Sequence, residues 1–423
     1  MNDFFEHNNI LKLHFDYVVS DSSELAIKEA ICLDSIDSVL RKCLNIDEMK
    51  EVGSFFTGQR LATKLVSKFL DDIDDNSVIL DPTCGAGNLL IECSRHLSVM
   101  SSLKLTLNRW GHALRGYDIR ESFVEATKLR LILEAINRGA KKDCSLEEAI
   151  NYFNFVKVCS VMDLHEEDVI GVTHAIMNPP FATWDSPKRD FWRNGKVNSA
   201  GIVFEHVLKI LPASTNISSI LPDVLRSGSR YCYWRDFISN NMTAKSEIHG
   251  RFSVNTDVDV FILYGLVRRK NSDEIQWFET FQNEKKLSDE YDVCIGPLVA
   301  YRDRQEGDLF PFIHPKTAPA WSKVEKFVEF RRYFGKVFKP PLVVIRRTSS
   351  PTDRFRAIGC IIDGVSSVAI ENHMIVVVPK DGSLHKCQKL LELLKSENVN
   401  IFLNERIRLR HLTVEVIKNI PIS

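Results

Sequence analysis

The four residues Asn178-Pro179-Pro180-Phe181 have the chemistry to hold an amino group attached to a flat ring. They follow the apolar run 174–177, which we expect to form a short buried strand. Proline cannot continue a sheet ladder and restricts the residue before it, so the chain must leave the sheet in a rigid loop. An ordinary turn after a strand is the simpler interpretation of the same residues.

A loop of this composition suits an exocyclic amine. The side-chain oxygen of Asn178 and the backbone carbonyl of Pro179 can accept its two hydrogens, and Phe181 can stack on the ring. Such hydrogen bonds draw the nitrogen out of conjugation and free its lone pair for attack on a methyl donor. The loop therefore indicates a site that methylates an amino group.

A second segment can bring backbone close to a ligand. The β-branched run 78–80 leads into Asp81, Thr83, Gly85 and Gly87, and an apolar helical pattern follows. This order predicts a strand, a glycine-containing turn and a helix, with the helix N-terminus beside the turn. The dinucleotide spacing Gly-x-Gly-x-x-Gly is not met, so a nicotinamide or flavin dinucleotide is not indicated.

Two carboxylates follow the next two predicted strands. Asp118 comes directly after the run 114–117, and Asp163 follows the run 155–159 through three intervening residues. In a doubly wound sheet, ligands lie outside the carboxyl ends of the strands. One acid could bind a ribose diol and the other an adenine amino group. Each acid alone could be a solvated loop residue, but four consecutive strand ends with suitable chemistry favour a common site.

These motifs and their order resemble the N6-adenine DNA methyltransferases of restriction–modification systems, in the γ order of motifs. The segment 53–62 resembles the family's first motif, although Phe55-Phe56-Thr57-Gly58 carries glycine where the family usually has proline. The glycine turn matches the S-adenosylmethionine loop. The run 216–222 resembles the fifth strand and the run 252–263 the closing hairpin, so the resemblance covers roughly residues 53–270. Thr57 could equally cap a helix.

The resemblance implies S-adenosylmethionine as the cofactor and a flipped adenine as the target. Asn178, Pro179, Pro180 and Phe181 would form the catalytic loop. The donor is already activated, so we expect neither a metal nor a strong base. The implied cofactor-binding positions are Phe56, Thr57, Asp81, Thr83, Gly85, Gly87, Asp118, Ile119, Asp163, Leu164 and Asn178.

Several rival functions share parts of this pattern. An RNA methyltransferase acting on adenine N6 or guanine N2 can use the same loop, but the Phe-Phe-Thr motif and the long C-terminal region favour DNA. A protein glutamine methyltransferase usually has tyrosine at the position of Phe181. A DNA-binding subunit with a decayed fold would not need the acids and the Asn178 loop together. Asn178, with this motif order, also favours adenine over cytosine N4.

The elements that carry these motifs predict an α/β protein. We expect a Rossmann-like class I methyltransferase sheet with helices on both faces, followed by a C-terminal α+β target-recognition domain. The predicted divisions are a helical extension over residues 1–52, the methyltransferase domain over 53–270 and the DNA-binding domain over 271–423. Predicted helices include 23–31, 36–44, 87–97, 121–138 and 384–397, and predicted C-terminal strands are 342–345, 357–362 and 374–378. The apolar stripe of 121–138, which includes Phe123, is expected to be core.

Composition is that of a globular protein: 423 residues, 44% hydrophobic and 26% charged, with a net charge of −1. No apolar run is long enough for a membrane span, and the ten scattered cysteines contain no Cys-x-x-Cys pair. We therefore expect a cytoplasmic protein with reduced thiols and no membrane association.

Positive charge is concentrated between residues 323 and 356, where ten Lys and Arg stand against three acids. Arg346, Arg347, Arg354 and Arg356 flank a Ser-Ser-Pro-Thr turn there and could grip phosphates or read guanine edges of double-stranded DNA. Surface arginines on a loop are the plain alternative. A separate restriction endonuclease or specificity subunit is a candidate partner.

Overall fold

A computed structural model gives the fold, and it describes residues 2–17, 23–43, 56–187, 189–253, 256–269, 275–278 and 285–422. The chain divides into two compact units, Met1–Trp277 and Phe278–Ser423. This division falls seven residues beyond the boundary expected after Lys270. No helix in the described ranges is long and apolar enough to cross a membrane.

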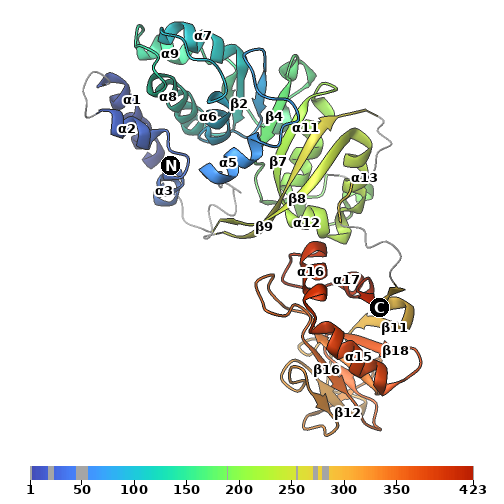
Figure 1. Cartoon of the computed structure of the whole chain (residues 1–423). Helices are drawn as coiled ribbons and strands as arrows, with labels where there is room; N and C mark the ends of the chain where they lie inside the picture. Colours follow the sequence, from blue (N-terminus) through green and yellow to red (C-terminus); the bar gives the residue numbers. More distant parts are fainter. Residues whose placement is uncertain are drawn as a thin grey trace. The chain divides into compact units, whose positions relative to one another are not determined.

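A seven-stranded sheet forms the centre of the first unit (Figure 1). Its order is β3-β2-β1-β4-β7-β9-β8, in which β3, β2, β1, β4 and β7 are parallel while β9 runs antiparallel to both β7 and β8. The strands are β1 (Ile79–Asp81), β2 (Leu114–Asp118), β3 (Val156–Val158), β4 (His174–Met177), β7 (Asn216–Pro222), β8 (Met242–Ser253) and β9 (Thr256–Val267). Each parallel strand coincides with a predicted run. A closing hairpin is present, but β8 and β9 extend beyond the predicted run 252–263, since β8 begins at Met242 and β9 ends at Val267.

Helices cover both faces of this sheet, as predicted. Ile79 and Leu80 are neighbours on β1, and each belongs to a different hydrophobic core. This alternation follows from the two-residue period of a strand buried on both faces. One core includes α5 (Gln59–Val66), α6 (Asn88–Ser94), α7 (Leu103–Ala113) and α8 (Glu121–Asn137), and the other includes α11 (Ser199–Ile210) and α13 (Cys232–Asn241). The remaining helices here are α9 (Leu146–Asn151), α10 (Arg189–Trp192), α12 (Asp223–Ser227) and three 3-10 turns, η1 (Val161–Asp163), η2 (Glu166–Val169) and η3 (Ser229–Tyr231).

The N-terminal helices share the first of these cores. They are α1 (Asn2–Asp16), α2 (Ser23–Ala30) and α3 (Ser35–Cys43), and α1 and α2 pack against α8. Phe4, Leu11 and Leu33 are buried in the same cluster as Leu129 of α8. The side chain of Asn8 also donates hydrogen bonds to the Ser122 carbonyl and to Glu125, both at 2.8 Å. These helices are therefore integral to the first unit.

A short hairpin follows the Asn-Pro-Pro-Phe loop. It consists of β5 (Thr183–Asp185) and β6 (Lys196–Asn198), and Trp184 pairs with Val197 across it. The hydroxyl of Ser199, the first residue of α11, donates hydrogen bonds to the carbonyls of Pro180 and Ala182. The start of a long helix thus fixes the loop.

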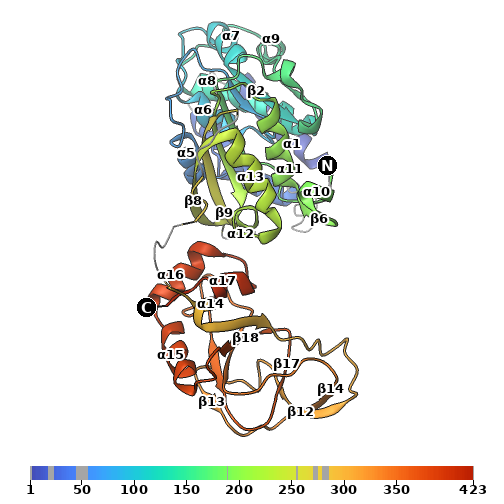
Figure 2. The same ribbon diagram turned by 90° about the vertical axis from the view of Figure 1, so that its right-hand side faces the viewer.

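In its described residues, the second unit combines three sheets with four helices, the predicted α+β composition. Figure 2 shows these strands and helices together in the second unit. One sheet has the order β11-β18-β15-β16-β13, the second has the order β14-β12-β17, and β10 pairs with β19 in the third. The strands are β10 (Lys285–Lys286), β11 (Tyr291–Ile295), β12 (Asp308–Ile313), β13 (Lys323–Val324), β14 (Phe330–Tyr333), β15 (Leu342–Arg346), β16 (Gly359–Ile362), β17 (Ala369–Ile370), β18 (Met374–Pro379) and β19 (Pro421–Ile422). The helices are α14 (Leu287–Glu290), α15 (Leu384–Leu394), α16 (Glu397–Arg406) and α17 (Val414–Lys418).

The predicted helix 384–397 is wrong in one respect, because the chain forms two helices there. α15 ends at Leu394, and Ser396 starts α16 by accepting a hydrogen bond from the Val399 amide. A serine at this position is a strong N-cap, so it favours a new helix over continuation of the old one.

Candidate active site

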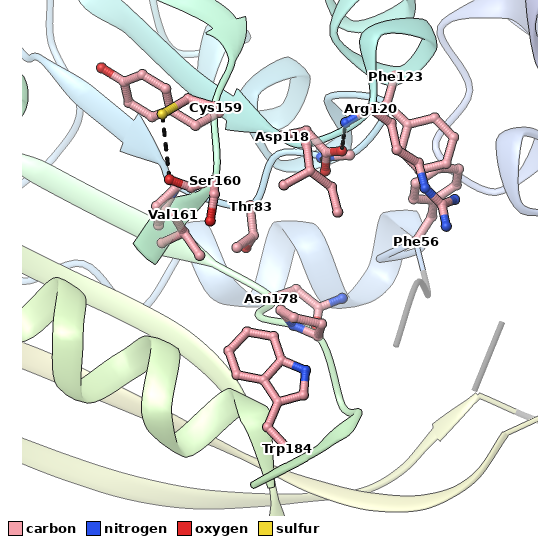
Figure 3. Close-up of a pocket in the computed structure, with 15 residues that line it drawn as sticks. Phe56, Thr83, Asp118, Arg120, Phe123, Cys159, Ser160, Val161, Asn178 and Trp184 are labelled. Atoms are coloured by element: carbon pink, nitrogen blue, oxygen red, sulfur yellow. Dashed lines mark hydrogen bonds between the residues drawn. The ribbon is translucent and has the colours of Figure 1, made fainter. Parts of the chain in front are cut away.

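A cavity opens at the carboxyl ends of the parallel strands of the first unit (Figure 3). This is the edge at which ligands bind in open α/β sheets. Asp118 and Thr83 lie along one side of the cavity, with Asn178 and Trp184 across from them. The wall consists of Phe56, Pro82, Thr83, Gly85, Tyr117, Asp118, Ile119, Arg120, Phe123, Cys159, Ser160, Val161, Asn178, Pro180 and Trp184.

The glycine turn brings backbone to the cavity. Gly85 and Gly87 have positive φ angles of 52° and 85°, which glycine adopts without steric cost. A Cβ on Gly85 would stand 2.8 Å from the Phe56 ring, and a Cβ on Gly87 would stand 2.8 Å from Thr127. Gly85 lines the cavity, whereas Gly87 lies behind the wall as the residue that starts α6.

Asp118 is held at the end of β2 by the backbone of two loops. Its carboxylate accepts hydrogen bonds from the Gly85 amide at 3.2 Å and from the Arg120 amide at 2.9 Å. Burial raises the pKa of Asp118, and these two hydrogen bonds oppose the rise. Ile119 beside it is 63% exposed and also lines the cavity, as expected for a residue that covers a bound ring.

Asp81 lies beneath the turn and does not belong to the cavity wall. It is fully buried at the end of β1 and accepts a hydrogen bond from the Thr83 amide at 3.1 Å. Burial, reinforced by the nearby Asp118 carboxylate, raises the pKa of Asp81 to about 8. Thr83, in contrast, lines the cavity, and its buried hydroxyl has no hydrogen-bond partner among the described residues. A bound polar group would satisfy it.

The structure does not bring Asp163 into the cavity wall. Asp163 ends the 3-10 turn η1 and is exposed, and Leu164 after it is buried in the second core. Ser160 and Val161 line the cavity instead. Because the turn begins immediately after Ser160, it carries the chain past the wall before Asp163 is reached. Asp163 is therefore not among the residues that line the cavity, and sequence spacing alone had not revealed this turn. Its contact with an adenine amine stays a prediction.

The catalytic loop contributes Asn178 and Pro180 to the wall. The Asn178 side-chain nitrogen donates a hydrogen bond to the hydroxyl of Thr57 at 3.1 Å. This contact joins the Asn-Pro-Pro-Phe loop to the first motif and sets the orientation of the amide. Thr57 itself is buried and lies outside the wall, and residues 53–55 of the first motif lie outside the described residues.

Phe181 is not among the residues that line the cavity, and another aromatic residue lines it. The Phe181 ring meets Phe252 edge-to-face, with centroids 5.6 Å apart and planes at 83°. Trp184, three residues further along, is the aromatic side chain that the hairpin places in the wall. Trp184 was not anticipated, although an aromatic residue this soon after the loop was a signal that could have been weighed.

Two phenylalanines, Phe56 and Phe123, line the cavity, and Phe4 of the N-terminal helices packs against both. Phe56 contacts Phe123 and Phe4 edge-to-face at 5.4 and 6.3 Å, and the Arg120 guanidinium lies 4.9 Å from the Phe123 ring centroid. Phe56 and Phe123 both line the cavity. Phe123 is thus core, as predicted, and also part of the site, which its helical stripe did not indicate.

A fully buried arginine on α8 connects the glycine turn to the N-terminal helices. Arg130 donates hydrogen bonds to the carbonyls of Ala30 (2.9 Å), Cys32 (3.1 Å) and Ala86 (2.5 Å) and to the Asn88 side chain (2.7 Å). Burial lowers its pKa to about 9, so the guanidinium stays charged at neutral pH.

The Asn88 amide continues this network. Its nitrogen donates to the carbonyls of Leu33 and Thr57, at 2.9 and 2.7 Å. The turn between α2 and α3, the glycine turn and the first motif therefore share one buried hydrogen-bond network. A network satisfied in this way favours a single arrangement of the site.

Glycine at position 58 also has a structural explanation. Gly58, not Thr57, precedes α5, and the cap is supplied by Asp34, whose carboxylate accepts the Gln59 amide at 2.9 Å. A Cβ on Gly58 would lie only 2.5 Å from that carboxylate oxygen. Glycine therefore stands where the family usually has proline because Asp34, from the N-terminal helices, caps α5 at this position. The expectation that Thr57 caps the helix is wrong.

The four arginines predicted to contact DNA have different environments in the second unit. Arg356 is fully buried and donates hydrogen bonds to Ser349, Asn404 and the Leu409 carbonyl. It is therefore a structural residue, and the expected DNA contact by Arg356 is corrected. Arg346 and Arg347 are partly buried, and Arg354 is exposed.

The fold is that of the class I methyltransferase sheet: parallel strands closed by an antiparallel hairpin, with a glycine turn and a strand-end acid at one cavity. Residues 38–225, somewhat less than half of the chain, match the family model described as N-6 DNA Methylase. The match starts within α3, upstream of the motif at Gly53. None of the curated protein sequences matches the chain.

Solved structures of restriction–modification proteins resemble the chain at low sequence identity. The type IIL enzyme MmeI in complex with DNA is 11% identical, with 92% of this chain and 71% of that chain covered and a TM-score of 0.57. The type IIG endonuclease BpuSI is 14% identical, covers 92% of this chain and has a TM-score of 0.47, and this chain spans 61% of its length. A type I methyltransferase subunit from Streptococcus thermophilus is 18% identical, with 59% and 53% covered and a TM-score of 0.39.

Proposed function

We propose that this chain transfers a methyl group from S-adenosylmethionine to N6 of an adenine in double-stranded DNA, within a restriction–modification or defence system. One observation carries the proposal: the glycine turn and Asp118 line the same cavity as Asn178 and Pro180. A donor motif and an amine-binding motif that share one cavity bring the two reacting groups together. The DNA methylase family of residues 38–225 supplies the class of substrate.

The wall suits S-adenosylmethionine. The Asp118 carboxylate can accept the ribose hydroxyls, and Gly85 allows backbone to approach closely. Ile119, Val161 and Phe123 offer apolar contacts to a flat base, while the buried Thr83 hydroxyl awaits a polar partner. When bound, the cofactor supplies a methyl group already activated on a sulfonium.

The loop residues act on the target amine. Asn178, oriented by Thr57, and the Pro179 carbonyl accept the two amine hydrogens, which frees the nitrogen lone pair. Trp184 and Phe181 provide aromatic faces on this side of the site, and Phe252 supports Phe181. Because an adenine inside a duplex cannot reach such a wall, the base must leave the stack, at a cost of roughly a few kcal/mol. We place the protein in the cytoplasm, with its DNA.

The test is transfer of labelled methyl from S-adenosylmethionine to unmodified double-stranded genomic DNA, with nucleoside analysis of the product. We expect N6-methyladenine. Asn178→Ala should reduce transfer by at least about a hundredfold while cofactor binding persists. Asn137→Ala, an exposed change at the end of α8, is the matched control.

Other outcomes would redirect the assignment. Near wild-type methylation by Asn178→Ala would remove the loop from the mechanism. Transfer to structured RNA but not to DNA would make the protein an RNA methyltransferase. Cofactor binding without transfer to either would point to a required partner, such as a specificity subunit or an endonuclease.

A further inference from the structure

Exposed hydrophobic residues of the second unit are concentrated on one small sheet. Eight large hydrophobic side chains are exposed in the described part of this unit, and five of them lie between Tyr301 and Phe334. Tyr301 is 90% exposed, Phe334 81%, Leu309 58% and Phe330 54%. Solvent-exposed clusters of this kind mark binding surfaces, whereas scattered single residues do not.

Strand geometry places most of these residues on one face. Phe330, Arg332 and Phe334 alternate along β14 and the residue after it, so they point to the same side. Leu309 on β12 pairs directly with Arg332 across the antiparallel ladder and therefore shares that side. We call Leu309, Phe330, Arg332 and Phe334 the β14 patch, whereas Tyr301 lies on a turn that Arg331 holds from the opposite face of β14.

The turn that carries Tyr301 is attached to the same strand. Arg331, which alternates to the opposite face of β14, donates hydrogen bonds to the carbonyls of Ala300 and Asp303, at 2.9 and 2.7 Å. Arg332 donates to the Gly307 carbonyl at 2.9 Å. The patch is thus built on fixed backbone and its exposed rings do not belong to a loose loop.

β14 is also an edge strand, because the sheet order is β14-β12-β17. Proteins commonly protect sheet edges with charges, prolines or covering elements, since an exposed apolar edge invites aggregation. An edge that keeps two exposed phenylalanines around an arginine is therefore best explained by a binding partner. In Figure 2, β12 and β14 lie at the end of the second unit opposite α16 and α17.

The charge of the second unit indicates what kind of partner the β14 patch binds. Residues 278–423 contain 23 Lys and Arg against 18 Asp and Glu, a net charge of +5, while the whole chain has −1. Residues 323–339 contain six Lys and Arg and two acids. Both acids are already paired, Glu325 with Lys323 and Glu329 with His314. Over the whole segment 301–339, which includes Leu309, nine Lys and Arg stand against five acids, a net charge of +4. The surroundings of the patch therefore carry a net positive charge.

We infer that the β14 patch is a contact surface for double-stranded DNA. Arg332 supplies a planar donor set for a phosphate or a guanine edge, and the flanking rings supply faces for sugars and bases in a groove. A polyanion is complementary to the net positive charge of this unit. The inference rests on the proposed DNA methylation and extends it to residues away from the Ser349–Arg356 turn.

The experiment measures binding of the full chain to unmodified linear plasmid DNA at several salt concentrations. Phe330→Ala/Phe334→Ala should weaken binding by about tenfold or more with an unchanged salt slope, because stacking does not release counterions. Arg332→Gln should weaken binding and lower the salt slope by about one. The matched control is Lys389→Ala/Ile401→Ala, which removes one exposed charge and one exposed apolar side chain from α15 and α16.

The outcomes separate this inference from the function it rests on. S-adenosylmethionine affinity should be the same in every variant, which shows that the first unit is intact. DNA binding and methylation by the wild type, with patch variants equal to the control, would overturn the inference alone. Loss of wild-type self-association in Phe330→Ala/Phe334→Ala, with DNA affinity unchanged, would make the patch an interface between copies and also overturn it. No binding or methylation of DNA by the wild type would instead overturn the proposed function.

Discussion

Two turns of this molecule, one in each unit, are fixed by a fully buried arginine, and their surfaces differ. Arg130 binds the glycine turn from behind through the Ala86 carbonyl, so Gly85 still faces the cavity. In the turn 349–356, the buried arginine is Arg356 itself, one of the residues expected to face DNA. The glycine turn therefore keeps its predicted backbone groups at the cavity. In the turn 349–356, by contrast, one of the arginines predicted to contact DNA is buried.

The comparison shows which kinds of sequence motif have their predicted residues at the surface of a site in the folded protein. The glycine turn acts through backbone groups and a strand end, whose positions follow from local structure. The arginine-rich turn acts through long side chains, which can reach solvent or bend back to cap carbonyls with equal ease. Motifs made of backbone therefore predict a site more reliably than sets of arginines.

The largest expected effect tests this comparison directly. Arg130→Met and Arg356→Met should each lower the free energy of unfolding of their own unit by about 3–5 kcal/mol, because several buried acceptors lose their donor. Only Arg130→Met should also weaken S-adenosylmethionine binding, since only its network includes the glycine turn. Calorimetric melting with and without cofactor would resolve both effects. Equal cofactor affinity in the two variants would show that Arg130 supports the fold and not the site.

The next effect separates the two strand-end acids. Asp118→Ala should raise the dissociation constant of S-adenosylmethionine by about ten- to a hundredfold, as expected for loss of hydrogen bonds to a charged acceptor. Asp163→Ala should change it little, because Asp163 is exposed and outside the wall. Isothermal titration calorimetry measures both constants. A larger loss at Asp163 would restore the original expectation from the sequence.

A pH effect should arise from Asp81. Its folded-state pKa of about 8 exceeds the ordinary 3.8, so the folded state holds a proton that the unfolded state releases, and stability falls as pH rises toward 8. Four partly or fully buried histidines, whose pKa values are lowered by burial, act in the opposite direction only below about pH 6.5; they are His7, His174, His206 and His249. Between pH 6.5 and 8, Asp81→Asn should therefore gain up to about 2 kcal/mol relative to wild type. Urea unfolding without cofactor measures the slope, and a parallel slope in the variant would contradict the assignment.

The smallest effect concerns the cap at Gly58. Gly58→Pro restores the family's usual residue, and the observed φ of −69° suits proline. The new ring should displace the Asp34 carboxylate and lose a cap worth about 1 kcal/mol. In an Asp34→Ala background the same change should be neutral or slightly stabilising. A double-mutant cycle in thermal unfolding measures the coupling free energy between positions 34 and 58. Additive effects of the two substitutions would contradict this explanation.

The sequence alone determined the sheet and several of the residues that line the cavity. The strands at 174–177 and 216–222, the turn at Gly85 and the acid Asp118 were all placed correctly, because apolar runs, glycines and prolines act on the backbone within a few residues. The same local rules placed α8 and its end at Gly139.

Only the tertiary structure decided which side chains face the cavity. Trp184 and Phe123 entered the wall, Asp163 was left outside by a 3-10 turn, and Arg356 was buried. Asp34 reached α5 from a helix pair 25 residues away in the chain. These outcomes depend on packing between segments distant in sequence, where the free energy of burial and of satisfied hydrogen bonds outweighs any local preference.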